Sequence, residues 1–587
     1  MSFFVTPSRP GKMAAPVQKT YVDVLYDHAG YLRANGGRLG PGSLSGKSIC
    51  VVGSGPAGLV SAYLLKQQGA IVTVLEAANR VGGRVDSQRP MGPSDAAIFE
   101  MGAMRVPPSE QLFGYFWNDV FKLPPPSEFP DPGKVDTKIV FQNKVYDWPA
   151  SGHPPAIFHN VSTGWNNFAD SAVLSDLAAN LADPSKFAQA RATWQNLVYP
   201  GSAPPGPEQG YGAISFFQGL VQAFVENHQT YGCKQWTAQD FALFGALGLG
   251  SGGFGPLYQV NFAEIVRLVV NGLETNQQFY SAGLGSLTDA FANGLASIIQ
   301  NQRLVVGVSS HGGLEHPVRV NSVDSGGNHH TDYYDAVVIA TTTRSMQVDM
   351  DITEPPAMGS AGQAGMGEAA RVGTGALTMP ITNDQATAVQ ELHLMNSSKL
   401  FVLTQSKFWR NGDMPQNIQT DGLVRGLYCL DYPKSNHGVV LVSYTWGDDS
   451  TKYIAIKNPT ERFNLLIRSL SSYRELAPFV SALQSTALPQ YTKLIDWQDQ
   501  KQYYGAFKLN YPGQDLMNQV LYYQFLSSRN GVFLAGDSVG WCGGWIEGAL
   551  QTGMNAAAAI VQRFCGVGGL APNNPMTQNS AQYSYGP

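Results

Sequence analysis

One stretch, residues 47–84, constrains the fold of this chain more than any other part of the sequence. A short apolar run rich in β-branched residues (48–52) predicts a strand and continues at once into the glycine-rich turn GSGPAG (53–58). In 59–69 apolar residues recur at helical spacing up to a glycine, and a second apolar run (71–75) predicts another strand. Together these segments predict a βαβ unit.

The turn has the spacing of a dinucleotide-binding fingerprint. Gly53 permits the tight turn, Gly55 lets the backbone approach a pyrophosphate, and Gly58 lets the helix lie close on the strand. The diphosphate is then expected at the helix N-terminus, where unpaired N–H groups face it. Glu76 ends the second strand, where its carboxylate can accept a hydrogen bond from a ribose hydroxyl.

The residues behind the second strand bear on the choice between nicotinamide and flavin. The segment Arg80-Val-Gly82-Gly83-Arg84 places a glycine pair where the backbone can pass under a diphosphate. An arginine such as Arg84 can bind that diphosphate. We interpret the nucleotide as a flavin.

A close approach of the backbone to a ring is also predicted after the strand-like residues 98–100. Gly102, Ala103 and Met104 allow the backbone to come near a ring, and Arg105 is held rigidly by the two prolines that follow Val106. Arg105 is therefore a candidate fixed cation. The alternative is an ordinary surface arginine.

Near the C-terminus an apolar run ends in Gly536 and Asp537, and a glycine turn leads into a long helix with small residues on one face. Asp537 can bind a ribityl hydroxyl, and the backbone at Gly544, Trp545 and Ile546 can approach the isoalloxazine. Val306, in the strand that begins at residue 303, completes the set of predicted cofactor contacts.

Composition limits the class of protein. The 587 residues predict about two to four domains, and a net charge of −5 gives no reason to expect nucleic acid or an anionic membrane as a partner. Five cysteines without a CxxC pair indicate neither a disulfide framework nor a metal site. The sequence shows no signal peptide and no apolar run of membrane-spanning length, so we expect a cytoplasmic protein.

The pattern along the chain predicts a discontinuous arrangement. Strand-like runs separated by turns begin at residue 303, and the buried run 336–340 is expected to return to the sheet of the βαβ unit. The glycine-rich apolar stretch 241–260 predicts a buried loop, either beside a ligand or packed without one. We predict a mobile lead (1–20), a nucleotide-binding domain (21–110, 283–345 and 505–565), a mostly helical subdomain (111–282), a substrate-binding domain (346–504) and a loose tail (571–587).

Several blocks together resemble the flavin-containing amine oxidase superfamily: GSGPAG with EAANRVGGR, VVIATT, and LAGD with GGWIEGA. EMGAMRVPP, LFGALGLGSGGFGPLYQ, DGLVRGLYCLDY and VSYTWGDDS are similar to its L-amino acid oxidase and tryptophan 2-monooxygenase branch. The resemblance covers residues 20–565, except that 155–235 match poorly. It implies an α/β fold in which a discontinuous Rossmann-like FAD-binding domain of the amine oxidase type is joined to a mixed-sheet substrate domain and a helical subdomain. It also implies non-covalent FAD.

Five residues take catalytic roles from the resemblance. Arg105 would clamp a substrate carboxylate and Tyr444 would add a hydroxyl to it, while Lys399 would hold a water against flavin N5. Trp497 and Trp545 would form apolar walls. From the residues alone, Lys399 could be a solvated strand lysine and the aromatic residues ordinary core.

The resemblance implies an FAD-dependent L-amino acid oxidase. An L-amino acid would lose its Cα hydride to the flavin, and O2 would complete the turnover, giving a 2-oxo acid, ammonia and hydrogen peroxide. We prefer this reading because the poorly matching segment 155–235 suggests a remodelled entrance. The alternative is an L-tryptophan or aromatic amino acid 2-monooxygenase that yields the amide. We also expect a homodimer.

Three other functions are alternatives. A polyamine or monoamine oxidase would give Arg105 no carboxylate to bind. A non-enzymatic flavoprotein and an NAD-dependent dehydrogenase also remain as alternatives.

Overall fold

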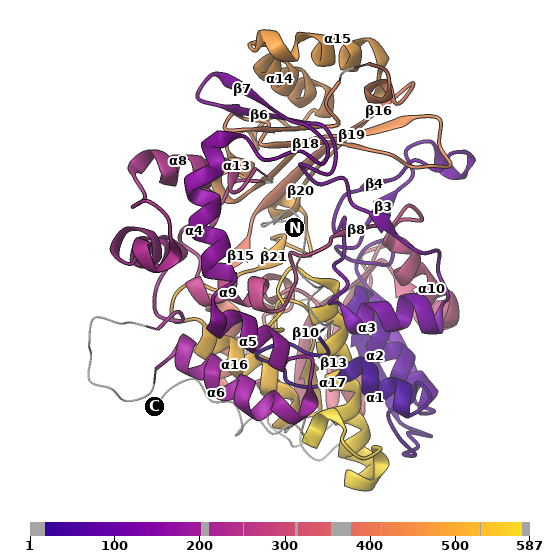
Figure 1. Ribbon diagram of the computed structural model, residues 1–587. Helices are drawn as coiled ribbons and strands as arrows, with labels where there is room; N and C mark the ends of the chain where they lie inside the picture. Colours follow the sequence, from indigo (N-terminus) through magenta and orange to yellow (C-terminus); the bar gives the residue numbers. More distant parts are fainter. Residues whose placement is uncertain are drawn as a thin grey trace.

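The computed structural model describes residues 18–200, 210–250, 252–311, 315–353, 377–412, 414–528 and 530–577. Two bodies of sheet and helix lie one above the other, with the nucleotide-binding sheet in the lower half and a larger mixed sheet in the upper half (Figure 1). None of the described helices is long and apolar enough to cross a membrane.

The nucleotide-binding sheet has five strands in the order β22-β13-β1-β2-β9. These are Val532–Leu534, Ala336–Ile339, Ser48–Val52, Ile71–Glu76 and Ile299–Asn301. All four pairings are parallel. Segments from three distant parts of the chain thus form one sheet, which confirms the predicted βαβ unit and the predicted return of residues 336–340.

Two helices pack together against this sheet. α2 (Pro56–Gln67) follows the glycine turn, and α17 (Ile546–Cys565) is buried from Ile546 to Val561. Glycine permits their contact, because a Cβ on Gly553 would lie 2.4 Å from the carbonyl oxygen of Ala57. The two helices therefore touch through backbone atoms.

A second, antiparallel sheet of four strands has the order β12-β11-β10-β14. Its strands are His329–Tyr334, Val318–Asp324, Arg303–His311 and Leu377–Thr378. The pairing of β10 with β11 shifts register between Val305 and Gly307. This irregularity changes which side chains of β10 face the nucleotide-binding sheet.

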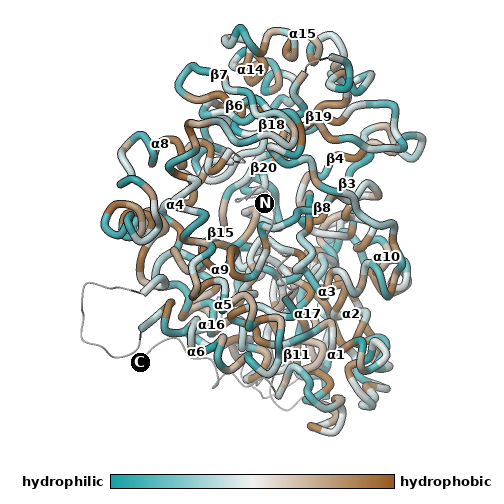
Figure 2. Tube along the Cα trace, viewed as in Figure 1, coloured by the Kyte–Doolittle hydropathy of each residue, from teal (hydrophilic) through white to brown (hydrophobic). Residues whose placement is uncertain are grey.

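The mixed sheet has seven strands in the order β20-β16-β19-β18-β17-β6-β7. They are Ala487–Asp496, Ser397–Thr404, Gly438–Trp446, Gly426–Leu430, Asn417–Thr420, Thr137–Phe141 and Lys144–Trp148. Hydrophobic and hydrophilic positions alternate along α14 (Pro459–Ser471) and α15 (Ala477–Thr486), as Figure 2 shows. Their apolar residues pack in one core with those of the sheet.

The predicted helical subdomain contains two strands of this sheet. β6 and β7 belong to the segment 111–282, but β6 pairs with β17 as a parallel neighbour. The two strands are joined through Gln142 and Asn143, which both have positive φ, as a tight hairpin requires. The alternating pattern of residues 137–148 is typical of strands. The predicted boundary at residue 111 therefore does not separate helices from the mixed sheet.

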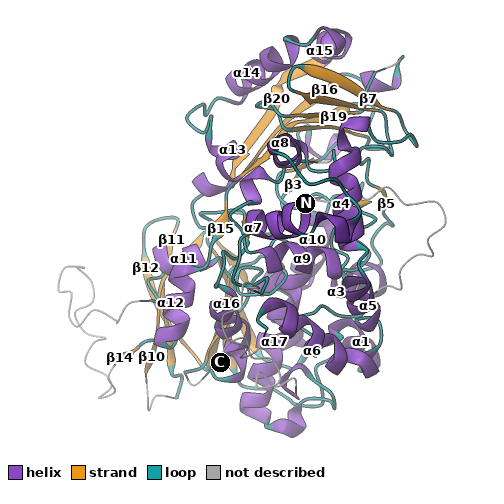
Figure 3. Ribbon diagram, turned by 60° about the vertical axis from the view of Figure 1, so that its left-hand side comes forward, coloured by secondary structure: helices purple, strands orange, loops and turns teal. Residues whose placement is uncertain are grey.

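Helices dominate the rest of that segment (Figure 3). The mostly helical character predicted for this segment is confirmed by α5 (Ala172–Asn180), α6 (Phe187–Val198), α7 (Phe216–Val221) and α9 (Phe262–Val270), whose apolar residues recur at three- and four-residue steps. Two more, α4 (His159–Ala169) and α8 (Ala238–Leu247), complete the set around the aromatic core at Trp165. The predicted short helix near residue 28 is α1 (His28–Ala34), which packs beside α3 (Gln111–Gly114).

The predicted loose tail is wrong for residues 571–577. Ala571 N–H donates to the Leu39 carbonyl (3.0 Å), and Tyr26 Oη donates to the Asn573 carbonyl (2.9 Å). The side chain of Asn574 is buried and accepts from the Met576 N–H (3.0 Å). A polar composition suggested a loose chain, but here the asparagine caps a local turn. Residues 578–587 and residues 1–17 of the predicted lead lie outside the described residues.

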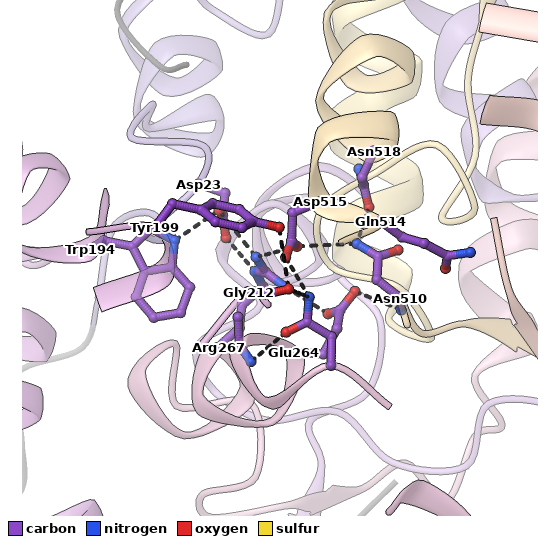
Figure 4. Close-up of polar contacts among 12 residues, drawn as sticks. Asp23, Trp194, Tyr199, Gly212, Glu264, Arg267, Asn510, Gln514, Asp515 and Asn518 are labelled. Atoms are coloured by element: carbon purple, nitrogen blue, oxygen red, sulfur yellow. Dashed lines mark hydrogen bonds and ion pairs between the residues drawn. The ribbon is translucent and has the colours of Figure 1, made fainter. Parts of the chain in front are cut away.

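A buried ionic network joins five segments of the chain (Figure 4). Arg267 on α9 pairs with Asp23, with Glu264 (2.9 Å) and with Asp515 (3.2 Å) on α16 (Asp515–Tyr522). Lys508 on β21 (Phe507–Lys508) pairs with Glu264 (2.9 Å). Trp194 on α6 donates to Asp23 (2.9 Å). Burial raises the pKa of Asp515, whereas Lys508 and Arg267 overcome the effect of burial and lower that of Glu264.

Removal of Arg267 should be strongly destabilising. Arg267→Met leaves the buried Asp23 and Asp515 without their cation, which costs roughly 3–5 kcal/mol. The urea midpoint of unfolding should fall clearly. The matched control is Arg33→Met, because Arg33 pairs with Asp119 at a half-exposed site where each side chain is 46% accessible. Equal midpoints for the two variants would contradict this assignment.

Candidate active site

One cavity runs from the glycine turn of β1 to the mixed sheet and is lined by most of the residues predicted to form the site. The cavity-lining members of that set are Gly53, Gly55, Glu76, Gly83, Arg84, Gly102, Ala103, Met104, Arg105, Lys399, Tyr444, Trp497, Gly536, Asp537, Gly544, Trp545 and Ile546. They come from both bodies of the molecule. The fold therefore brings together residues that the sequence places hundreds of positions apart.

Three predicted residues do not line the cavity. A Cβ on Gly58 would lie 1.9 Å from the Gly53 carbonyl oxygen, and one on Gly82 would lie 2.5 Å from that of Val85. These glycines shape the turns behind the cavity. In β10 the cavity is lined by Arg303, Leu304 and Val305 and not by the predicted Val306.

At one end the cavity has the features of an anion site. Gly55 is the N-cap of α2 and provides no side chain to the first turn. Gly83 has a φ of +59°, and a Cβ on it would lie 3.2 Å from Cα of Gly55. Two backbone segments without side chains thus meet at the N-terminus of a helix, where N–H groups and the helix dipole favour phosphate.

Glu76 lies beside this turn, and its carboxylate also holds the turn in place. Oε2 accepts from Ser54 N–H (2.7 Å) and Ser54 Oγ (2.6 Å), and Oε1 accepts from Ala78 N–H (2.8 Å). A carboxylate oxygen has more than one lone pair. Glu76 can therefore still accept from a ribose hydroxyl, as predicted.

Arg84 and Asp537 both line the cavity and form an ion pair that was not predicted from the sequence. Arg84 pairs with Asp537, and its Nη1 donates to the Ala506 carbonyl (2.8 Å). Asp537 Oδ2 also accepts from Gly544 N–H (3.3 Å). The pair joins two of the predicted nucleotide-binding blocks, which lie 453 residues apart.

Lys399 and Tyr444 stand on neighbouring strands at the far end. They are paired in register between β16 and β19, and Lys399 Nζ lies 4.8 Å from the centre of the Tyr444 ring. Nζ donates to the carbonyls of Glu100 (3.0 Å) and Gly102. Burial lowers the pKa of Lys399 to about 7, with Arg105 adding to the effect and Glu100 opposing it.

Arg105 is buried at the same end and is only 3% exposed. Its guanidinium lies 5.0 Å from the Phe129 ring, and Nη1 is 3.7 Å from Asp131 Oδ1. Nε and Nη1 have no hydrogen-bond partner among the described residues. A buried cation with free donors is costly unless it meets an anion, so this position fits a carboxylate ligand.

A smaller cavity shares Arg105 and Tyr444 with the first. Its wall includes Gly252, Gly253, Gln419, Tyr428 and Trp446. The glycine-rich stretch 241–260 therefore passes beside a cavity at the substrate end, while its contact with a ligand stays a prediction. Gln419 and Trp446 were missed in the sequence, although Trp446 lies in the block VSYTWGDDS.

The two predicted tryptophans lie at different places on the wall. Trp497 donates from Nε1 to the Met101 carbonyl (3.1 Å) and lies close to Gly102, whose added Cβ would be 3.4 Å from the indole. Trp545 is the N-cap of α17. Both contribute apolar surface to the cavity.

Residues 56–561 match the family model described as flavin containing amine oxidoreductase. The chain belongs to this family. Tryptophan 2-monooxygenase from Pseudomonas savastanoi is 34% identical over 96% of this chain and 98% of its own, and that from Pantoea agglomerans pv. gypsophilae is 32% identical over the same shares. A phenylalanine 2-monooxygenase precursor from a Pseudomonas species is 24% identical over 80% of this chain and 77% of its own.

Solved structures support the fold. Putrescine oxidase bound to putrescine superposes with a TM-score of 0.59 at 16% identity, covering 88% of this chain and 99% of that one. Cyclohexylamine oxidase from Brevibacterium oxydans gives a TM-score of 0.57 at 17% identity over the same shares. Identity this low shows the fold alone.

The cavity fits the flavin that the family implies. The side-chain-free cradle at Gly55 and Gly83 suits a diphosphate, and Glu76 suits a ribose. The cavity then continues past Asp537 and Trp545 to Lys399, which leaves room for the rest of a dinucleotide between the two sheets.

Gly55→Val should abolish flavin retention without unfolding the protein. Gly55 has a φ of −71°, and an added Cβ would meet nothing closer than Gly83 Cα at 3.9 Å, so the apoprotein can accept the side chain. The side chain would, however, fill the diphosphate cradle. Flavin content per protein after purification measures the effect. The matched control, Gly294→Val, lies on α10 (Gly285–Leu295) with nothing within 4 Å of its Cβ position and should stay yellow.

Proposed function

We propose that the protein oxidises L-amino acids with FAD and O2, and that it is an L-tryptophan 2-monooxygenase. The observation that carries the first part is the buried Arg105, which has two nitrogens without a hydrogen-bond partner among the described residues and, with Tyr444, lines both cavities. The second part is supported by the relatives named tryptophan 2-monooxygenase, which match nearly the whole chain.

The reaction requires that the substrate be held by its carboxylate. Arg105 would bind this group through charge-assisted hydrogen bonds, and Tyr444 would add its hydroxyl. Burial and the nearby Arg105 favour the neutral form of Lys399, so its amine can take or give a proton near neutral pH. Bound FAD supplies the two-electron oxidation and the reaction with O2.

The two outcomes considered from the sequence differ in what happens after the first oxidation. An oxidase consumes L-tryptophan, O2 and water and yields the 2-oxo acid, ammonia and hydrogen peroxide. A 2-monooxygenase converts L-tryptophan and O2 to indole-3-acetamide, carbon dioxide and water. The second outcome requires that the oxidised amino acid stay in the site, and a buried arginine on its carboxylate favours retention.

The comparisons favour the monooxygenase over the oxidase that we preferred from the sequence. That preference relied on a remodelled entrance in residues 155–235. No described residue of this segment lines either cavity, so the argument loses its support. The fold likeness to putrescine oxidase does not favour an amine substrate, because an amine leaves Arg105 without an anion.

Product analysis tests the proposal. The purified protein with FAD, L-tryptophan and O2 should form indole-3-acetamide and carbon dioxide in equal amounts. Stoichiometric hydrogen peroxide and 2-oxo acid would instead establish the oxidase. Phenylalanine and leucine run in parallel would define the preference for the side chain.

Arg105→Met should raise KM for L-tryptophan by about 100-fold, because a buried charge-assisted contact is worth roughly 2–4 kcal/mol. Flavin content should not change. Tryptamine, which lacks the carboxylate, is the internal control: its kcat/KM should change little, so the preference for tryptophan over tryptamine should collapse. If kcat/KM falls equally for tryptophan and tryptamine, Arg105 has another role.

Four finer predictions from the sequence belong to this proposal. FAD is bound without a covalent link, so denaturation with acid should release it to the supernatant. The protein forms a homodimer and acts in the cytoplasm. The division into nucleotide-binding, helical and substrate-binding domains is proposed with β6 and β7 reassigned to the mixed sheet.

A further inference from the structure

A third acidic residue, Glu110, lines the cavity with Glu76 and Asp537 and has no part in the site described above. It is 2% exposed and is the N-cap of α3. Its Oε2 accepts from the backbone N–H of Glu547 in the first turn of α17, at 2.8 Å. Its Oε1 has no hydrogen-bond partner among the described residues. One oxygen of this buried carboxyl group is therefore unpaired among the described residues.

Glu547 in turn accepts hydrogen bonds from backbone N–H groups of α3. Its two carboxylate oxygens accept from the N–H groups of Leu112 (3.0 Å) and Phe113 (2.8 Å), and Gln551 adds a third bond (3.3 Å). Each glutamate therefore satisfies N–H groups at the start of the other's helix. Glu547 uses both oxygens in this way and does not line the cavity, whereas Glu110 uses one oxygen and does.

Burial and mutual repulsion disfavour a charge on both carboxyl groups at once. Burial, and then Glu547, raises the pKa of Glu110 well above its usual value, while burial raises that of Glu547 to about 7. Two buried like charges repel, so one group keeps its proton. Glu547 accepts three hydrogen bonds and is the better anion, which leaves the proton on Glu110. Because Oε2 accepts from an N–H, this proton sits on Oε1.

We propose that Glu110 is a flavin-binding residue: as a neutral carboxylic acid it donates a hydrogen bond from Oε1 to an acceptor atom in the flavin half of FAD. The flavin half is favoured because Glu110 is bonded to the first turn of α17, next to Trp545 and Ile546, whereas the diphosphate cradle lies at the start of α2. The inference depends on the family's flavin and not on the proposed substrate, so it can fail or hold independently of the product assay.

Two substitutions at Glu110 separate a neutral donor from an ionised acceptor. In Glu110→Gln the amide oxygen can accept from Glu547 N–H and the amide nitrogen can donate into the cavity. Glu110→Met has a similar length and no donor. Titration of each apoprotein with FAD, followed by flavin fluorescence, should give a Kd within about threefold of wild type for the glutamine and about tenfold or more weaker for the methionine. An equal loss of affinity for FAD in both variants would overturn the proposal that Glu110 is a neutral donor.

ADP is the probe that distinguishes a contact to the flavin from general damage to the fold. It fills the adenosine diphosphate half only, so calorimetric Kd values for ADP should agree within about twofold among wild type and both variants. If Glu110→Met weakens ADP and FAD alike, the residue acts on the fold or at the diphosphate, and the proposal is wrong.

Glu547→Gln is the control for the helix-capping role. It lies on the same pair of helices but outside the cavity, and its amide nitrogen would face an N–H group. Burial is a larger cause of the raised pKa of Glu110 than the charge of Glu547, so Glu110 should keep its proton in this variant. The melting temperature of the apoprotein should fall, while the Kd for FAD should change less than in Glu110→Met. If Glu547→Gln weakens FAD binding as much as Glu110→Met, capping alone explains the effect and Glu110 needs no direct contact with the flavin.

Discussion

Close contact between backbone segments is the constraint on which the cavity depends. A Cβ on Gly58 would lie 1.9 Å from the Gly53 carbonyl oxygen, one on Gly102 would lie 1.8 Å from that of Arg84, and one on Gly553 would lie 2.4 Å from that of Ala57. No side chain can be added at these distances without moving the backbone. The first contact closes the turn before α2, the second places residue 102 against Arg84, and the third holds α17 against α2. Residues of all these segments line the cavity.

Charge is distributed along the cavity in a way that follows from this packing. Arg84 and Asp537 both line the cavity and neutralise each other there. At the substrate end Arg105 and Lys399 lie in one buried region, where the closest acid to Arg105, Asp131, is 3.7 Å away and has its pKa raised by burial to about 6. Nε and Nη1 of Arg105 are left without a hydrogen bond among the described residues, and the carboxylate of an anionic substrate can accept from them.

The sequence was sufficient to predict most of the nucleotide-binding sheet, because local signals fix it: β-branched strands, a glycine turn and a periodic helix. It was also sufficient to select most of the residues that line the cavity. The sequence was not sufficient where contacts between distant segments determine the structure. The hairpin at 137–148 has a readable pattern but joins a sheet whose other strands come from beyond residue 396. The Arg84–Asp537 pair and the reciprocal capping by Glu110 and Glu547 depend on contacts across more than 400 residues, and no local pattern contains them.

The two cations at the substrate end are suited to different tasks. A guanidinium stays protonated at any physiological pH, so Arg105 provides a permanent charge for a carboxylate. An ammonium loses its proton readily when buried, and the pKa of Lys399 is lowered to about 7 with Arg105 contributing to the shift. When a carboxylate binds Arg105, the repulsion between the two cations is partly cancelled. The ammonium form of Lys399 then becomes more stable, so the arrival of the substrate's anionic end itself changes the protonation of the neighbouring amine.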